Sequence, residues 1–185
     1  MKILVTGASG FIGATVCDRL MSEGQDFLPI YRADRGLGFA VGNIDSKTEW
    51  YNALSGITHV VHTAARVHVM KEEFADPLLE FRKINVEGTL NLARQSIRSG
   101  VKRFIYLSSI KVNGEQTKPR QPFTEEGVLT SDDPYALSKY EAELGLQKLA
   151  SRASMEVVII RPPLVYGPGV KANFLSLMKL VRTGW

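Results

Sequence analysis

The sequence predicts an α/β fold with a doubly wound, mainly parallel sheet that is flanked by helices. Along its 185 residues, short apolar runs alternate with longer stretches of helical period, as parallel strands joined by crossover helices do. A glycine-spaced turn follows the first apolar run, and 44% hydrophobic with 23% charged residues is typical of a globular domain. No internal repeat or linker interrupts the pattern, so we expect one domain over 1–185.

The N-terminal elements form the pattern strand, helix, strand. An apolar run at 2–5 predicts the first strand, residues 11–23 have helical period, and 27–31 form the second apolar run. Val41 marks a short third strand, and the apolar run at 58–62 follows a Ser-Gly turn signal. These features predict a first βαβ unit followed by a buried strand.

The second half continues the alternation. Its predicted elements are a helix over 72–99 closed by Gly100, a strand over 103–107, a loop over 113–131, a helix from 134 to about 149, a strand over 157–160 and a helix over 173–181. The segment Asp132-Asp133-Pro134 predicts the start of the helix at 134, because it places an acidic cap before a proline at the first helical position. The loop at 113–131 is long for a compact domain, as loops at binding sites often are.

Several classes of protein are excluded by composition. Cys17 is the single cysteine, so no intramolecular disulfide forms, and His59, His62 and His68 lie in one short stretch without zinc-ligand spacing. No apolar window has the ~20 residues that cross a bilayer, and the first apolar run is too short for a secretory signal. We therefore expect a cytoplasmic protein with no metal site and no membrane contact.

The charge pattern favours a small anionic ligand. The formal net charge is +4 and the pI is near 9.2, yet Lys and Arg are scattered without runs or interleaved aromatic residues. We expect no nucleic-acid partner. A modest positive balance suits a dinucleotide or a nucleotide sugar.

The turn after the first strand has the features of a dinucleotide site. Gly7, Gly10 and Gly13 recur every third residue where the strand turns into a helix. A turn without side chains lets backbone N–H groups approach a pyrophosphate, the helix N-terminus favours negative charge, and the last glycine allows close helix–strand packing. The context predicts dinucleotide binding more strongly than the glycines alone.

The end of the second strand bears on which dinucleotide binds. An acidic residue there would bind the ribose of NAD, and a cation would bind the 2′-phosphate of NADP. The chain has Tyr31 at the strand tip, followed by Arg32, Asp34 and Arg35. NAD and NADP both remain open; the two arginines favour NADP, while Asp34 could reach a ribose.

A candidate acid/base pair lies in the helix after Pro134. Tyr135 and Lys139 are four residues apart and share one helix face. Lowering a phenol pKa by about 3 units, to work near neutrality, requires about 4 kcal/mol of phenolate stabilisation, and a nearby ammonium contributes with the right sign. Ser109 follows the strand at 103–107, where ligands of parallel sheets bind; the alternative is a helix-cap or turn serine.

Six segments carry a resemblance to a known family. In order and spacing, the chain resembles the extended short-chain dehydrogenase/reductases, and within them the nucleotide-sugar epimerase, dehydratase and reductase branch with a Rossmann-type fold. The segments are T-G-A-S-G-F-I-G (6–13), H-T-A-A (62–65), N-V-E-G-T (85–89), L-S-S-I-K-V-N-G (107–114), Y-A-L-S-K (135–139) and R-P-P-L-V-Y-G-P-G (161–169). The fourth most resembles bacterial 4-epimerases and 4-keto reductases of UDP-linked hexosamines in surface-polysaccharide synthesis.

The resemblance implies roles for particular residues. Tyr135 would be the catalytic acid/base, Lys139 would lower its pKa and bind the nicotinamide ribose, and Ser109 would hold the reacting sugar oxygen. Cofactor contacts would come from Gly7, Gly10, Phe11, Ile12, Gly13, Arg32, Asn43, Ile44, Ala64, Ala65, Asn85, Pro163 and Val165. Core packing is the alternative for Val165. Tyr166 is expected to be structural.

The chain departs from the family pattern in a few places. Asn43-Ile44 stands where an acidic–apolar pair commonly contacts the adenine, and Asn113 replaces a tyrosine common on the sugar side. Tyr31 replaces the acid that a tightly held NAD would need. Family members continue past residue 185 into a smaller C-terminal substrate region, so we expect this chain to be a truncated piece.

The expected function is NAD(P)-dependent epimerisation at the sugar 4-position through a keto intermediate, on a substrate that is a UDP-sugar. One alternative is NADPH-dependent reduction of a 4-keto sugar, and another is a non-catalytic dinucleotide-binding regulator on the same fold. The resemblance also implies a homodimer through the helices at 72–99 and 134–149. Packing of those helices on their own sheet explains the same apolar positions.

Overall fold

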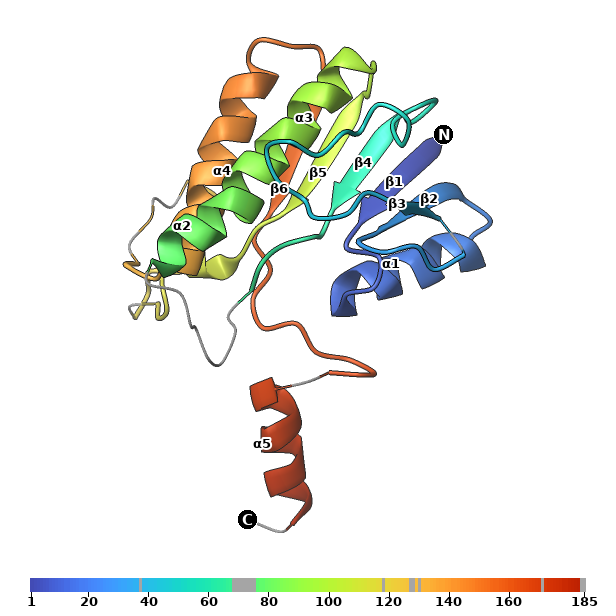
Figure 1. Ribbon diagram of the computed structural model, residues 1–185. Coiled ribbons are helices and arrows are strands. Elements are labelled where there is room, and N and C mark those ends of the chain that lie inside the picture. Colours follow the sequence, from blue (N-terminus) through green and yellow to red (C-terminus); the bar gives the residue numbers. More distant parts are fainter. Residues whose placement is uncertain are drawn as a thin grey trace.

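The computed structural model describes residues 1–36, 38–67, 76–117, 119–126, 129, 131–170 and 172–183. Its strands form one parallel sheet in the order β3-β2-β1-β4-β5-β6 (Figure 1). The strands are β1 (Lys2–Thr6), β2 (Asp26–Tyr31), β3 (Phe39–Ala40), β4 (His59–His62), β5 (Arg103–Leu107) and β6 (Glu156–Ile160). The strand order reverses between β1 and β4, and ligands of such sheets bind outside the carboxyl ends of the strands at this point. The predicted doubly wound parallel sheet is confirmed.

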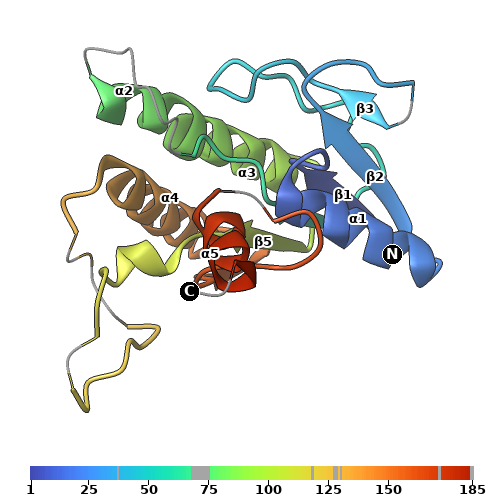
Figure 2. The ribbon, with the colours of Figure 1, turned by 90° about the horizontal axis from the view of Figure 1, so that it is seen from below.

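Helices cover both faces of the sheet (Figure 2). In chain order, the helices of the described residues are α1 (Phe11–Ser22), α2 (Pro77–Phe81), the π-helix η1 (Arg82–Gly88), α3 (Thr89–Arg98), the 3-10 helix η2 (Ile110–Val112), α4 (Pro134–Ala150) and α5 (Ala172–Arg182). Alternating residues of β1 serve the two faces: Ile3 packs with Cys17 of α1, and Leu4 packs with Leu92 of α3 and Leu146 of α4. The apolar faces of α3 and α4 therefore cover their own sheet.

The helix predicted over 72–99 is confirmed from Pro77 to Arg98, where α2, η1 and α3 follow one another without a break, but the prediction did not include the π-helical turn. Residues 72–75 lie outside the described residues, and from Pro77 the chain forms α2, then a π-helical turn, then α3. One extra residue in a turn leaves an apolar stripe almost unchanged, so periodicity alone does not reveal it. The π turn brings Asn85 to the buried side of the helix, where 1% of the residue is exposed.

The signals at helix ends are confirmed. The Asp133 carboxylate accepts a hydrogen bond from the Tyr135 backbone N–H at 2.8 Å, and Pro134 is the first residue of α4. Gly100, with φ +78°, lies just past α3 in the left-handed region that glycine adopts without strain. The third strand pairs at 39–40 rather than at Val41, although the Val41 N–H still donates to the Tyr31 carbonyl at 3.1 Å.

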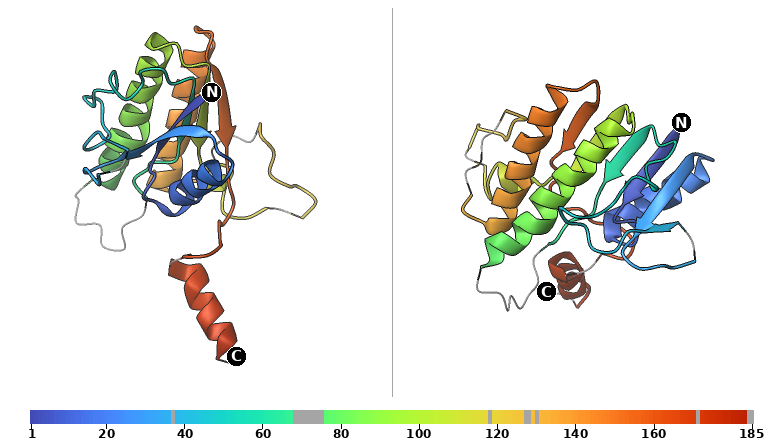
Figure 3. Two further views of the ribbon diagram at one scale, coloured as in Figure 1. Left: turned by 90° about the vertical axis from the view of Figure 1, so that its right-hand side faces the viewer. Right: turned by 45° about the horizontal axis from the view of Figure 1, so that its top comes forward.

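The last described helix, α5, stands apart from the sheet (Figure 3). Its Leu177, Met178, Leu180 and Val181 side chains are about half exposed, while Phe174 stacks on Tyr166 with ring centres 4.9 Å apart. Tyr166 thus contacts α5 through this ring pair, while 68% of its surface is exposed. Among the described residues, no helix combines the length and the apolar character that crossing a bilayer requires.

Candidate active site

The glycine turn between β1 and α1 has no side chains at the points where the backbone packs most closely. Gly7 has φ +68°, and a Cβ atom on it would lie 2.8 Å from the Ala64 nitrogen. A Cβ atom on Gly13 would lie 2.1 Å from the Gly7 carbonyl oxygen, so α1 approaches the turn more closely than any side chain permits. Gly10 caps α1 without a side-chain hydrogen bond, which leaves N–H groups at the helix N-terminus for an anion.

A cleft of about 710 Å³ opens at the carboxyl ends of β1, β2, β3 and β4. The predicted cofactor residues that line it are Gly7, Gly10, Arg32, Asn43, Ile44, Ala64 and Ala65. Sequence reasoning missed Ser9, Thr63, Arg66, Val67 and Ile84, which also line it. Ser9 and Thr63 lie inside recognised segments, and Arg66 and Val67 directly follow one, so position alone could have found these four.

Other predicted cofactor residues lie outside the cleft lining. Phe11 is 37% exposed and Gly13 is buried beneath the turn, where it supports the turn through packing. Pro163 and Val165 are exposed after β6. The alternative of core packing for Val165 is wrong, because 37% of its surface is exposed. Ile12 is half-buried in the first turn of α1, also outside the lining.

The end of β2 makes one side of the cleft cationic. Tyr31, Arg32 and Arg35 line it, and the Arg35 guanidinium carbon lies 5.5 Å from the centre of the Tyr31 ring. The Asp34 carboxylate accepts a hydrogen bond from the Gly36 N–H at 2.8 Å and does not belong to the lining. Two guanidiniums and no carboxylate of this segment therefore border the cleft.

The segments that carry Ser109, Tyr135 and Lys139 meet at the carboxyl end of β5. Lys139 is 2% exposed; its ammonium donates to the Leu107 carbonyl at 2.7 Å and lies 4.5 Å from the Tyr106 ring centre. Ser109, two residues beyond Leu107, accepts a hydrogen bond from the Lys111 N–H at 3.3 Å and so caps η2. The cap role considered as the alternative for Ser109 is thus present. The Tyr135 ring packs edge-on against Phe81 at 5.9 Å.

The ionisation of this pair differs from the expectation. Burial, with the Asp133 carboxylate as a second cause, raises the pKa of Tyr135 to about 12. Burial also lowers the pKa of Lys139 to about 7, although Glu143 acts in the opposite direction. The expected lowering of the phenol pKa is wrong for the ligand-free protein. The Lys139 ammonium is itself desolvated and is directed at a carbonyl and the Tyr106 ring.

A buried amide connects the cleft to this group of residues. The Asn85 side chain accepts from the Arg66 N–H at 2.8 Å, donates to the Arg66 carbonyl at 3.0 Å, and donates to the Ser138 hydroxyl at 3.0 Å. Ser138 in turn donates to the Tyr135 carbonyl at 2.8 Å. Arg66 lines the cleft and Ser138 lies between Tyr135 and Lys139, so Asn85 joins the two halves of the site.

His62 is a structural residue below the glycine turn. Its two ring nitrogens lie 2.7 Å from the Thr6 hydroxyl and 2.9 Å from the Thr89 hydroxyl. Burial, and secondarily the charge of Lys139, lowers the pKa of His62 to about 3, so the ring is neutral. Within the described part of the chain, no group of three or more His, Cys, Asp or Glu residues could hold a metal ion.

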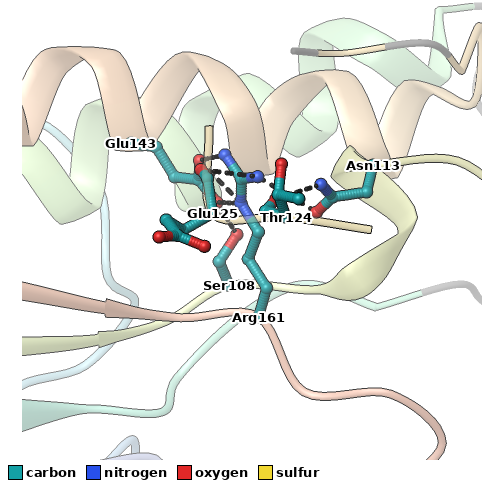
Figure 4. Close-up of polar contacts among 6 residues, drawn as sticks. All are labelled: Ser108, Asn113, Thr124, Glu125, Glu143 and Arg161. Atoms are coloured by element: carbon teal, nitrogen blue, oxygen red, sulfur yellow. Dashed lines mark hydrogen bonds and ion pairs between the residues drawn. The ribbon is translucent and has the colours of Figure 1, made fainter. Parts of the chain in front are cut away.

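A buried ion pair that sequence reasoning missed joins α4 to the end of β6 (Figure 4). Arg161, at the end of β6, binds Glu143 of α4 through two guanidinium nitrogens, at 2.6 and 3.0 Å, and the Glu143 side chain is 1% exposed. Ser108 donates to the same carboxylate, and Arg161 also donates to the Asn113 side chain at 3.0 Å. The available signal was helical spacing, since Glu143 follows Lys139 by one turn.

Comparisons with known proteins agree with this architecture. A UDP-glucose 4-epimerase of Vibrio cholerae is 50% identical over 188 residues, covering 99% of this chain and 57% of that protein. The structure of a Thermotoga maritima UDP-glucose 4-epimerase with UDP-glucose has a TM-score of 0.77 at 28% identity, covering 96% of this chain and 61% of that one. A Thermus thermophilus UDP-glucose 4-epimerase in complex with NAD has a TM-score of 0.80 at 26% identity, covering 92% and 58%.

This chain thus spans less than two thirds of the length of each of these relatives. The family described as "NAD dependent epimerase/dehydratase family" matches residues 3–181. The predicted resemblance is confirmed: the chain belongs to the NAD dependent epimerase/dehydratase family.

Proposed function

We propose that the protein is a nucleotide-sugar epimerase that acts at the sugar 4-position through a keto intermediate, on a UDP-linked sugar. The observation that carries the proposal is the Asn85 bridge, which ties the cleft wall at Arg66 to the helix turn between Tyr135 and Lys139. The wall of the proposed dinucleotide cleft is thereby connected by hydrogen bonds to the helix turn that carries Tyr135 and Lys139. The UDP-glucose 4-epimerases among the relatives support the reaction class.

The cleft fits a nicotinamide dinucleotide. Its glycine turn has no room for side chains and exposes helix N–H groups, as a pyrophosphate requires. Gly7 and Gly10 would hold the pyrophosphate, Asn43 and Ile44 would contact the adenine, and the backbone at 64–65 would lie along the cofactor. The bound group would accept a hydride from the sugar carbon and later return it.

The residues at the end of β5 would perform the proton transfers. Tyr135, as phenolate, removes the proton of the sugar 4-hydroxyl while a hydride leaves the same carbon; after the keto sugar turns over, Tyr135 returns the proton as the hydride adds to the opposite face. Ser109 would hold the reacting oxygen. Lys139 would stabilise the phenolate and bind the nicotinamide ribose. Because burial raises the pKa of Tyr135 to about 12, ligand binding must supply the stabilisation of the phenolate.

The test is conversion of UDP-linked hexoses and hexosamines by the whole protein, followed by NMR of the C4 configuration. The expected result is interconversion of the 4-epimers without net consumption of cofactor. Tyr135→Phe should abolish turnover and leave dinucleotide binding nearly intact. Interconversion that survives in Tyr135→Phe would remove the acid/base role, and failure of every nucleotide sugar tested would remove the function.

A second candidate is an NADPH-dependent 4-keto-sugar reductase. It is favoured by Arg32 and Arg35, which border the cleft where an NADP 2′-phosphate would lie. In that reaction Tyr135 would donate a proton to the keto oxygen, and bound NADPH would supply the hydride for the carbon. Stoichiometric oxidation of NADPH by a keto sugar would select the reductase over the epimerase. The regulator alternative is opposed by the intact Ser109, Tyr135 and Lys139, and any turnover would exclude it.

The proposed homodimer would use the outer surfaces of α2 and α4. Leu79 on α2 and Leu144 on α4 are each 48% exposed, while the inner faces of α3 and α4 pack on the sheet. Sedimentation of the whole protein before and after Leu144→Glu would test this. A wild-type protein that stays monomeric would contradict it.

A further inference from the structure

We infer that Lys111 is a positioning residue for the active site: it joins the turn that carries Ser109 to the first turn of α4 and screens the capping carboxylate of Asp133 from the Tyr135 phenol. The inference rests on the proposed acid/base role of Tyr135. It concerns a residue that does not line the cleft and whose contacts are to Ser109 and Asp133. Its effect therefore acts through its neighbours.

Lys111 contacts both the turn that carries Ser109 and the first turn of α4, which carries Tyr135. Lys111 is the middle residue of η2, directly after β5. Its backbone N–H donates to the Ser109 hydroxyl at 3.3 Å, and its ammonium donates to one oxygen of Asp133 at 2.6 Å. The second oxygen of Asp133 accepts from the Tyr135 N–H at 2.8 Å. One residue is thus attached to Ser109 through its backbone and to the Tyr135 helix turn through its side chain.

The charge of Asp133 opposes what Tyr135 must do. A carboxylate at the helix start satisfies backbone N–H groups, but its negative charge near a phenol disfavours the phenolate, and it contributes to the raised pKa of Tyr135. A neutral cap would avoid this cost. The ammonium of Lys111 offers another solution, because it lets Asp133 keep its cap while its charge is compensated at 2.6 Å.

The surroundings make this pair different from an ordinary surface ion pair. The Asp133 side chain is 12% exposed and the Lys111 side chain 38%, so the pair is partly shielded from the water that screens fully exposed pairs. Other groups around Tyr135 are Phe81 of α2, Tyr106 of β5, and Lys139 of α4; Arg82 of η1 is paired with Glu141, and Glu143 with Arg161. Lys111 forms an ion pair with Asp133, the carboxylate that contributes to the raised pKa of the phenol.

The experiment compares Lys111→Met, Lys111→Arg and the double variant Lys111→Met/Asp133→Asn in the whole protein, with kcat/KM followed against pH. Lys111→Met should raise the apparent pKa of the catalytic base by about half a unit to one unit, and so lower kcat/KM about 3- to 10-fold below that pKa. Lys111→Arg should restore most of the profile. The double variant should return the apparent pKa to or below the wild-type value, because the negative charge of the Asp133 carboxylate is gone.

The matched control is Lys83→Met. Lys83 pairs with Glu80 on an exposed helix surface, and its loss should leave the profile unchanged. An unchanged apparent pKa in Lys111→Met would overturn the inference. A second outcome would also overturn it: Lys111→Met loses activity, its apparent pKa does not shift, and adding Asp133→Asn does not restore the activity. That result would indicate a purely structural ion pair.

A second measurement separates this inference from the proposed function. Difluorotyrosine placed at position 135, whose phenol is more acidic than that of tyrosine, can be titrated by fluorine NMR without any substrate. The titration midpoint should rise in the Lys111→Met background and fall when Asp133→Asn is added. Should no nucleotide sugar react, these shifts would still support the charge screening, and their absence would refute it.

Discussion

Asn85 and Ser138 are joined by a hydrogen bond of 3.0 Å between two side chains that are almost completely buried. Asn85 comes from the π-helix and Ser138 from α4, so the contact spans two helices over one face of the sheet. On its other side, Asn85 holds both backbone groups of Arg66 at the cleft wall. A movement of either helix would therefore be transmitted to the cleft.

Asn85→Ala should destabilise the protein by about 2 to 3 kcal/mol, because it leaves the Arg66 N–H and carbonyl without their side-chain partner. Dinucleotide affinity should fall more than the stability loss alone explains at temperatures where the variant is folded. Ser138→Ala should have a smaller effect, since it leaves the Arg66 contacts in place. Urea unfolding and calorimetric titration measure the two quantities. Asn52→Ala, at an exposed loop position, is the control.

Lys139→Met should change stability in a pH-dependent way. The folded-state pKa of Lys139 is lowered to about 7, below the ordinary value of 10.5, so between these values the unfolded chain binds the additional proton. Wild-type stability should therefore rise with pH over this window. The free energy of unfolding of Lys139→Met minus that of the wild type should therefore be larger at pH 6 than at pH 9, by about 2 to 3 kcal/mol.

Because the free energies of unfolding of the two proteins are compared at each pH, the contributions of other titrating groups cancel. A stability difference that is constant between pH 6 and pH 9 would show that Lys139 carries its charge in the folded protein throughout. Catalytic activity should be lost in Lys139→Met at every pH. The two outcomes are independent, because the stability measurement needs no substrate.

Breaking the Glu143–Arg161 pair should cost about 3 to 5 kcal/mol, because Arg161→Met leaves the buried Glu143 carboxylate without its cation. The double variant Glu143→Leu/Arg161→Met should be much less destabilised than Arg161→Met alone. The exposed pair Arg103–Glu156 is the control, and Arg103→Met should cost about 0 to 1 kcal/mol. Equal losses for Arg161→Met and Arg103→Met would mean that burial of the pair contributes nothing.

Arg32→Ala should weaken NADP binding about 10- to 100-fold and leave NAD binding nearly unchanged, since a charge-assisted hydrogen bond to the 2′-phosphate contributes about 1.5 to 3 kcal/mol. Calorimetric titration with each dinucleotide measures this. Arg35→Ala separates the two guanidiniums, because Arg35 also packs over the Tyr31 ring. A wild-type protein that binds NAD more tightly than NADP would contradict the preference.

The sequence was most informative where function depends on local backbone form. The glycine turn and the Asp133 cap follow from short-range sterics and stand where predicted, and β1, β2, β4, β5 and β6 lie within one residue of their predicted bounds. The π-helical turn could not be predicted from the sequence, because one inserted residue hardly disturbs the apolar stripe of an amphipathic helix. Nor could the sequence reveal that Lys139 is directed to the Leu107 carbonyl, since that depends on how deeply α4 is buried beside β5.

Gly13→Ala should abolish dinucleotide binding through the turn, although Gly13 itself lies outside the cleft lining. A Cβ atom there would lie 2.1 Å from the Gly7 carbonyl oxygen and 2.7 Å from the Thr63 hydroxyl, so the turn must move. Gly24→Ala is the matched control: that glycine has φ +64° and no atom within 4 Å of the added carbon, so it should lose about 1 kcal/mol of stability through backbone strain alone. Calorimetric titration and urea unfolding of both variants separate the effects, and undiminished binding by a folded Gly13→Ala protein would show that the turn does not position the dinucleotide.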